Sequence, residues 1–437
     1  MNKILCHCKI IFLMAVLLSG GLSASCQTAA DSLSLAKIIS TVIANHPSVK
    51  QASEGITSAE AGIGLARSGY FPNIDATASY ARIGPVQELT FPGFGTFQLY
   101  PADNYSASLN VYQNVYDFGK THKNVLLAKE VKNLNEQTLD QVKQKLAYSA
   151  TLIYYSMVYL QQAIVINKDQ LKTLKEHLEF VKKKQETGSA IQYEILSTEV
   201  KISAVESAGI DLQTSLQNQI SEMNALMGQS GNITVNNELN ITLPDIPVDS
   251  LLSIAYKQRD ELKLAHQKTA LAEMKYKLIK TQEYPSLNLQ LTGGGKNGYI
   301  PNLNAVKANF TAGIGLKVPI FQGTRTKYTL LQAKSAINST DFETELIKRN
   351  IAAEVAENEE NIKASLKKID RYTLLLSQSK EAFRLAQMNY QAGSITNLDI
   401  LDAATTISES SLLLFRSRID YIINVFKLKA SLGERLY

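Results

Sequence analysis

Two copies of one sequence pattern follow each other along the chain, and this duplication restricts the possible folds more than any other feature. The segment GSAIQYEIL at 188–196 corresponds to GSITNLDIL at 393–401, at an offset of 205 residues. Two further pairs have the same offset: YDFGK at 116–120 with FQGTR at 321–325, and LMG at 226–228 with SLG at 431–433. Nearer the N-terminus, FPNI at 71–74 pairs with YPSL at 284–287 at an offset of 213 residues. The chain is therefore predicted to contain two structural repeats, residues 27–243 and 244–437.

The first 26 residues are typical of an export signal, which predicts that the mature chain leaves the cytoplasm. Lys3 and Lys9 precede the apolar run IIFLMAVLL at 10–18, and small residues follow it. Two interpretations of Cys26 stay open. It is either the lipid-modified first residue of a lipoprotein or an ordinary residue near the cleavage site, since a serine stands where lipoprotein signals prefer leucine.

Composition argues against several classes of protein. All three cysteines, Cys6, Cys8 and Cys26, lie in or beside the signal, so disulfides and cysteine-based zinc sites are not expected. The 45 basic and 40 acidic residues give a net charge of only +5 and are spread along the chain, so no nucleic-acid partner is predicted. No HExxH or GxSxG motif occurs, and the glycine run 293–298 lacks phosphate-loop spacing. No enzyme activity, metal or cofactor is therefore expected.

Each half carries two segments in which apolar residues alternate with polar or small ones. They lie at 74–80 and 105–111 in the first half, and at 287–292 and 310–320 in the second. A period of two with one apolar face predicts half-buried strands. No stretch after the signal reaches the ~18 to 20 consecutive apolar residues of a spanning helix, so any membrane role needs strands, for which a length of ~10 residues is suitable.

The remaining segments are predicted to be helical. Residues 120–187 and 324–392 contain neither glycine nor proline. A helix of ~65 residues would be ~100 Å long, and such a rod needs packing partners along its whole length. Shorter helical segments flank the strands and the long helices, at 34–69, 189–227, 250–283 and 394–432. Two of them, end to end, would match one long helix.

Four strands cannot close a barrel alone, and a membrane does not tolerate open sheet edges. Several copies of the chain must therefore join, which describes a tube anchored in an outer membrane and projecting into the periplasm.

With these motifs in this order, the chain resembles the TolC-like outer-membrane efflux family over nearly its whole mature length. The resemblance implies a mixed fold, an all-α barrel plus a transmembrane β-barrel, with long coiled-coil helices and four strands per chain. It implies a homotrimer with a 12-stranded β-barrel and an α-helical periplasmic tunnel. The implied function is the exit duct of a tripartite efflux pump or type I secretion system. The implied partners are a periplasmic adaptor, an inner-membrane pump and outer-membrane lipid.

The resemblance also assigns roles at the two turns between the helices, which the family uses as the periplasmic entrance. Asp399 and Asp402 correspond to acidic positions that constrict the pore, and Glu194 matches Asp399 in the first half. Tyr390 corresponds to a tyrosine that holds the entrance shut. The turns themselves are predicted to dock the adaptor through Gly188, Ser189, Ala190, Gly393, Ser394 and Ile395. Ile395 departs from the family pattern, which has an arginine there.

Each assignment has a simpler structural alternative. Asp399 and Asp402 lie three residues apart, which places them on one face of a helix whether they line a pore or only contact water. Tyr390 could serve in packing alone, and Gly188 and Gly393 suit a left-handed turn. The alternative to a channel is a periplasmic coiled-coil scaffold, which would not explain the four strands.

Overall fold

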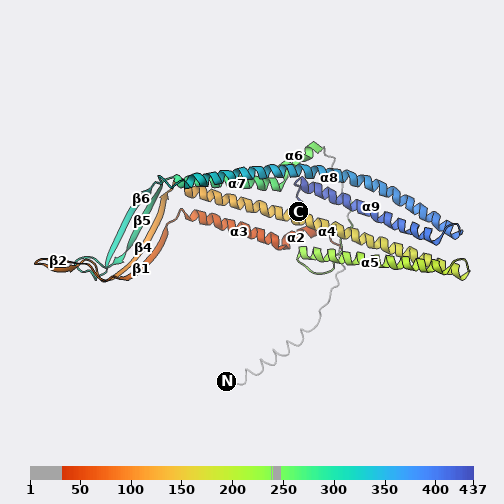
Figure 1. Cartoon of the computed structure of the whole chain (residues 1–437), viewed down its shortest axis with the longest axis horizontal. Helices are drawn as coiled ribbons and strands as arrows, with labels where there is room; N and C mark the ends of the chain where they lie inside the picture. The colour runs from red at the N-terminus through yellow and green to blue at the C-terminus, as the bar shows by residue number, and fades with distance from the viewer. Residues whose placement is uncertain (1–31, 238, 240–247) are drawn as a thin grey trace, which may run out of the picture.

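The computed structural model describes residues 32–237, 239 and 248–437, so the predicted signal and Cys26 lie outside the described residues. The described chain is elongated, with a four-stranded sheet at one end and long helices over the rest of its length (Figure 1). The two turns between helices lie at the end farthest from the sheet. The molecule therefore has a strand end and a helix-turn end.

Both halves present the same order of elements: helix, two long strands, a very long helix and a return helix. The first half consists of α2 (Leu35–Asn45), α3 (Pro47–Ser68), β1 (Asn73–Arg82), β4 (Asp103–Tyr116), α4 (Lys120–Glu186) and α5 (Gln192–Met227). The second consists of α6 (Val248–Gln258), α7 (Asp260–Lys280), a 3-10 turn (Thr281–Glu283), β5 (Ser286–Lys296), β6 (Lys307–Lys317), α8 (Arg325–Gln391) and α9 (Asn397–Ser431).

The four long strands form one antiparallel sheet in the order β1-β4-β5-β6. Its register separates the side chains by chemistry. One rung joins Ile74, Val111, Leu291 and Ala312, and the adjacent rung joins Asp75, Asn110, Thr292 and Thr311. In the polar rung the Asn110 amide donates to Asp75 at 3.0 Å, and the Thr292 hydroxyl donates to Asn110 at 3.1 Å. Because successive side chains point to opposite faces, the sheet has one apolar face and one polar face.

A small hairpin was not predicted from the sequence, which indicated only a long connection after β1. It is formed by β2 (Glu88–Phe91) and β3 (Gly95–Gln98) and stands at the outer end of the sheet (Figure 1). Its strands have four residues each, too few to show a clear period. It lies in the first half only, where the change of offset from 213 to 205 placed extra residues.

The helices α4 and α8 contain 67 residues each and set the length of the molecule. Along α4 lie α3 and α5, and along α8 lie α7 and α9 (Figure 1). Part of α4 is long and apolar enough to span a membrane by composition alone, but half of that stretch is buried in the chain. Tyr154 and Met157 of α4, for example, are fully buried in a core with Met223 and Ile422. This apolar stretch is therefore explained by packing between helices.

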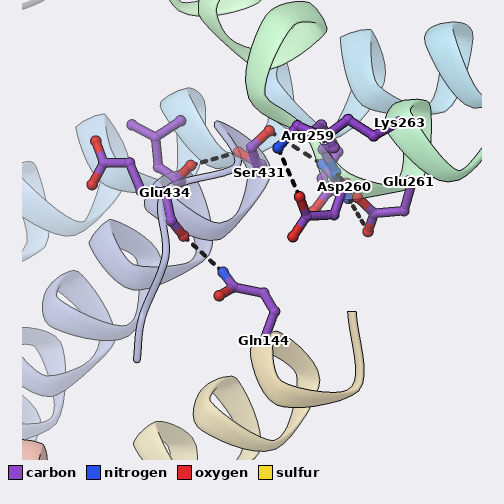
Figure 2. A network of polar contacts seen from close by, with 9 residues as sticks. Gln144, Arg259, Asp260, Glu261, Lys263, Ser431 and Glu434 are labelled. Carbon is purple, nitrogen blue, oxygen red and sulfur yellow. Dashed lines mark hydrogen bonds and ion pairs between the residues drawn. The ribbon is translucent and has the colours of Figure 1, made fainter. Parts of the chain in front are cut away.

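The shorter helices of the second half meet at a polar junction, drawn in Figure 2. The Arg259 side chain, only 12% exposed, forms an ion pair with Glu261 at 2.9 Å. It forms a second ion pair with Glu354 of α8 at 2.6 Å. Arg259 also donates to the Ser431 carbonyl at the end of α9. Gln144 of α4 donates to the Glu434 carbonyl at 2.7 Å. These contacts fix the ends of α7 and α9 to both long helices.

Candidate channel entrance

The two turns at the helix end have the same backbone geometry. Gly188 and Gly393 adopt φ angles of +73° and +74°, in the left-handed region. After α4, the Gly188 amide donates to the Gln185 carbonyl and the Ser189 amide donates to the Lys184 carbonyl. The Gly393 and Ser394 amides make the corresponding bonds after α8. Both turns are thus Schellman caps, and the expected left-handed role of the two glycines is confirmed.

The structure places Asp399 and Asp402 on the exposed surface at the start of α9. Asp402 has an exposed side chain, whereas the Asp399 carboxylate belongs to a capping box. Its Oδ2 atom accepts from the Thr396 amide at 2.8 Å and from the Thr396 hydroxyl at 2.7 Å. These hydrogen bonds lower the pKa of Asp399 and keep it ionised. Asp399 therefore has a local structural role beside any role in a pore.

Glu194 and Tyr390 meet across the two turns, although 196 residues separate them. The Tyr390 hydroxyl donates to the Glu194 carboxylate at 2.5 Å, and the tyrosine is only 4% exposed. Burial, followed by the bond to Glu194, raises the pKa of Tyr390, so it stays protonated and donates. Lys184 donates to the Tyr390 carbonyl at 3.2 Å, and its ammonium group lies 4.4 Å from the ring centre. One tyrosine thus joins the first hairpin to the second.

A second polar contact joins the same hairpins through residues that the sequence did not single out. The His177 Nε2 atom of α4 lies 2.7 Å from the Asn397 Oδ1 atom at the start of α9. The Asn397 amide donates to the Glu194 carbonyl at 3.2 Å, to the Ser197 hydroxyl at 3.1 Å and to the Thr198 hydroxyl at 3.2 Å. Asn397 lies 220 residues from His177 and 203 residues from Glu194 in the chain, so no local motif could have revealed these contacts.

An apolar layer surrounds these polar contacts. Its buried members come from all four helices of the two hairpins: Leu174, Leu178, Val181, Ile195, Ile202, Val205, Tyr390, Ile400, Leu401 and Ala404. A cavity of about 170 Å³ lies within it, lined in part by His177, Phe180, Phe383 and Tyr390. Among the described residues, no group of three or more His, Cys, Asp or Glu is arranged to hold a metal ion.

The adaptor-docking candidates lie at the outermost part of the two turns. Gly188, Ser189, Gly393 and Ser394 are exposed, while Ala190 and Ile395 are half-buried and pack against the apolar layer. Ile395 therefore contributes to packing at the position where the family pattern has an arginine. The turns present backbone and small side chains to the solvent, and the polar contacts that join the hairpins lie just behind them.

Comparison with known proteins identifies the class. The family model of outer membrane efflux proteins matches residues 38–229 and 251–434, most of both halves. The chain belongs to the outer membrane efflux protein family.

Individual relatives are distant but cover most of the chain. The outer membrane protein TolC of Vibrio cholerae is 22% identical over 408 residues, 91% of this chain and 90% of the relative. The alkaline protease secretion protein AprF of Pseudomonas aeruginosa is 21% identical over 329 residues, 73% of this chain and 68% of the relative. Among solved structures, CusC has a TM-score of 0.78 at 19% identity and covers 95% of both chains.

The chain is therefore an outer-membrane channel protein that extends into the periplasm, the exit duct of an efflux or secretion system. Its family consists of channels and not of enzymes. The expected TolC-like family, function and location are confirmed.

Proposed function

We propose that three copies of the chain close their sheets into one 12-stranded barrel in the outer membrane. The observation that carries this proposal is the amphipathic sheet, in which β1 and β6 each pair with only one strand of the described chain. In lipid, each unpaired edge would leave backbone groups without hydrogen bonds, and pairing β1 of one copy with β6 of the next removes both edges. The apolar face would then contact lipid and the polar face would line the passage.

The long helices support the same assembly. Four apolar side chains of α8 are each more than half exposed: Tyr328, Leu331, Phe342 and Leu346. Their spacings of about one or three helical turns place them on one face of the helix. An isolated chain leaves these side chains in water. Packing against a neighbouring copy would bury them and complete an α-helical tunnel in the periplasm.

We propose further that the two turns form the periplasmic entrance, held closed by the Tyr390–Glu194 hydrogen bond. This bond joins α8 to the start of α5 directly behind the turns, so separating the hairpins must break it. Three-fold symmetry would bring Asp399 and Asp402 of each copy towards one axis, where they constrict the passage and attract cations. A periplasmic adaptor that binds the exposed turns, in concert with an inner-membrane pump, would open the entrance.

The test of the closed entrance is Tyr390→Phe, which removes only the hydroxyl group. The expected result in planar lipid bilayers is a mean conductance larger by about tenfold or more, because a hydrogen bond to a charged group contributes about 1.5–3 kcal/mol. Tyr193→Phe is the matched control, since Tyr193 lies at the same end of the molecule and is 72% exposed. Equal conductance of Tyr390→Phe and the unmodified protein would contradict the proposed latch.

Adaptor binding has its own test. Photo-crosslinkers placed at Ser189 and Ser394 in cells are expected to capture a periplasmic adaptor, whereas one at Thr214, on the exposed side of α5 well away from the turns, is expected not to. Capture from Thr214 but not from the serines would place the docking surface elsewhere. The transported substrate is set by the pump, since relatives of one fold are named for both protease secretion and efflux.

A further inference from the structure

The strongest feature that the proposed latch does not use is the His177–Asn397 contact. Asn397 is 6% exposed and is the first residue of α9, so its side chain fixes the start of that helix. It bonds to α4 through His177 and to α5 through Glu194, Ser197 and Thr198. The second hairpin is thus attached to both helices of the first by one amide.

The hydrogen-bond pattern defines which His177 nitrogen carries a proton. The Asn397 Nδ2 group faces three oxygen acceptors, so its Oδ1 atom must be the one that faces His177. An amide oxygen only accepts, so Nε2 of His177 must donate. In the neutral ring, Nδ1 is then the free nitrogen and the atom that would take up a further proton.

The surroundings of His177 favour the neutral ring. Burial is the main cause that lowers the pKa of His177, and it outweighs the bond to Asn397 and the negative charge of Glu194 from α5. Lys184, on the same helix, adds a positive charge that acts in the same direction as burial. From α8 the neighbour is the ring of Tyr390, 5.2 Å away between centres, and α9 contributes the uncharged Asn397.

Protons can reach this site. His177 lines the cavity of about 170 Å³, which is several times the volume of one water molecule, about 30 Å³ in the liquid. The cavity lining is mixed, because Leu174, Ile400 and Leu401 are apolar whereas Glu176, next to His177 on α4, carries a carboxylate. Within the described chain neither Glu176 nor Glu194 forms an ion pair with His177, so protonation would place a positive charge beside the apolar layer, which is unfavourable without a full counter-charge. Separating the hairpins would return His177 to water.

We propose that His177 and Asn397 form a second latch of the channel entrance, which acidification releases. The proposal rests on the proposed entrance at these turns, but the bond that it concerns, between His177 and Asn397, is separate from the Tyr390–Glu194 bond. Because the pKa of His177 is lowered in the joined state, the joined state is favoured above the ordinary histidine pKa of about 6.5. This preference for the joined state is lost as the pH falls below that value. For each unit by which the joined state lowers the pKa of His177, full protonation shifts the equilibrium towards opening by about tenfold.

The test is a pH profile of the full-length protein in planar bilayers at about pH 7.5 and about pH 5, on either side of the ordinary histidine pKa. The unmodified channel is expected to open several-fold more often at the lower pH. His177→Gln keeps a donor to Asn397 but cannot take up a proton, so it should stay closed and lose the response. Asn397→Leu should open at both pH values. His122→Gln is the matched control, an exposed histidine of the same helix near the sheet, and should respond as the unmodified protein does.

Amide hydrogen exchange at the start of α9 gives a second readout that needs no channel activity. Each variant is compared with the unmodified protein at the same pH, so that the intrinsic exchange rate cancels. Acid should speed exchange in the unmodified protein relative to His177→Gln. If acid speeds exchange in the unmodified protein relative to His177→Gln but the bilayer recordings show no opening at these turns, the result would contradict the proposed entrance and still support the second latch. A response to acid that His177→Gln retains in both measurements would overturn the second latch, whatever Tyr390→Phe does.

Discussion

Glu194 and Asp399 occupy equivalent positions in the two halves, yet their carboxylates have different partners. Each is the third residue of its helix. Before α9 the capping residue is Thr396, whose hydroxyl and amide both bind Asp399. Before α5 the capping residue is Ile191, which has no polar side chain, and Glu194 instead accepts from Tyr390. One substitution at the capping position thus leaves one carboxylate available to join the hairpins.

The acidic pair is expected to make the narrowest part of the entrance cation-selective. Changing both Asp399 and Asp402 to alanine should weaken cation selectivity and abolish block by multivalent cations in single-channel recordings. The capping box adds an effect that the sequence did not show, since Asp399→Ala also removes the two hydrogen bonds that the carboxylate accepts from Thr396. Asp399→Asn with Asp402→Asn is the cleaner variant, because an amide oxygen can still accept from Thr396. Unchanged selectivity in this variant would place the constriction elsewhere.

Two glycines with similar backbone angles should differ in their tolerance of a side chain. Gly393 and Gly433 have φ angles of +74° and +81°. A Cβ atom on Gly393 would have no heavy atom within 4 Å, whereas one on Gly433 would lie 2.6–2.8 Å from the backbone of Gln258 and Arg259. Gly393→Ala should therefore cost about 1–2 kcal/mol for the left-handed backbone alone. Gly433→Ala should cost more, because the junction of α6 and α7 must also move.

Thermal unfolding of the purified protein measures both costs. Gly62→Ala is the control, since Gly62 lies within α3 with open space around it and its replacement should be neutral or stabilising. Equal destabilisation by Gly393→Ala and Gly433→Ala would show that the close approach between Gly433 and the backbone of Gln258 and Arg259 does not affect stability.

At the scale of elements, the strands and helices lie close to where the sequence pattern placed them. The predicted long helix 120–187 is observed as Lys120–Glu186, and 324–392 as Arg325–Gln391. Runs free of glycine and proline mark helices well, because both residues destabilise a helix interior. The β2–β3 hairpin was missed because strands of four residues carry little periodic signal.

The two faces of β5 provide a test of the barrel at this scale. Leu289 pairs with Ile314 on the apolar face, and Gln290 is its neighbour on the polar face. Leu289→Arg should disturb assembly by about 2–4 kcal/mol if it lies near the middle of the bilayer. Gln290→Arg should assemble normally. The measurement is the yield of heat-modifiable oligomer in outer-membrane fractions, and equal yields of the two variants would contradict the assignment of faces.

At the scale of the whole molecule, the unpaired sheet edges and the exposed apolar side chains of α8 predict a homotrimer. Mass measurement of the detergent-solubilised protein should give three chains per particle. A monomer or a dimer as the only stable species would contradict the closed barrel.

The sequence by itself determined the duplication, the strand and helix segments and the membership of a channel family. Each of these depends on local periodicity or on motif order, which chain segments carry without reference to one another. The family resemblance pointed to Tyr390 at the entrance, but only the tertiary structure decided which side chains pair across the hairpins. His177 and Asn397 are 220 residues apart in the chain, and Tyr390 and Glu194 are 196 apart. Such pairs meet only because helix packing fixes the relative rotation and height of four helices, and no local pattern encodes that geometry.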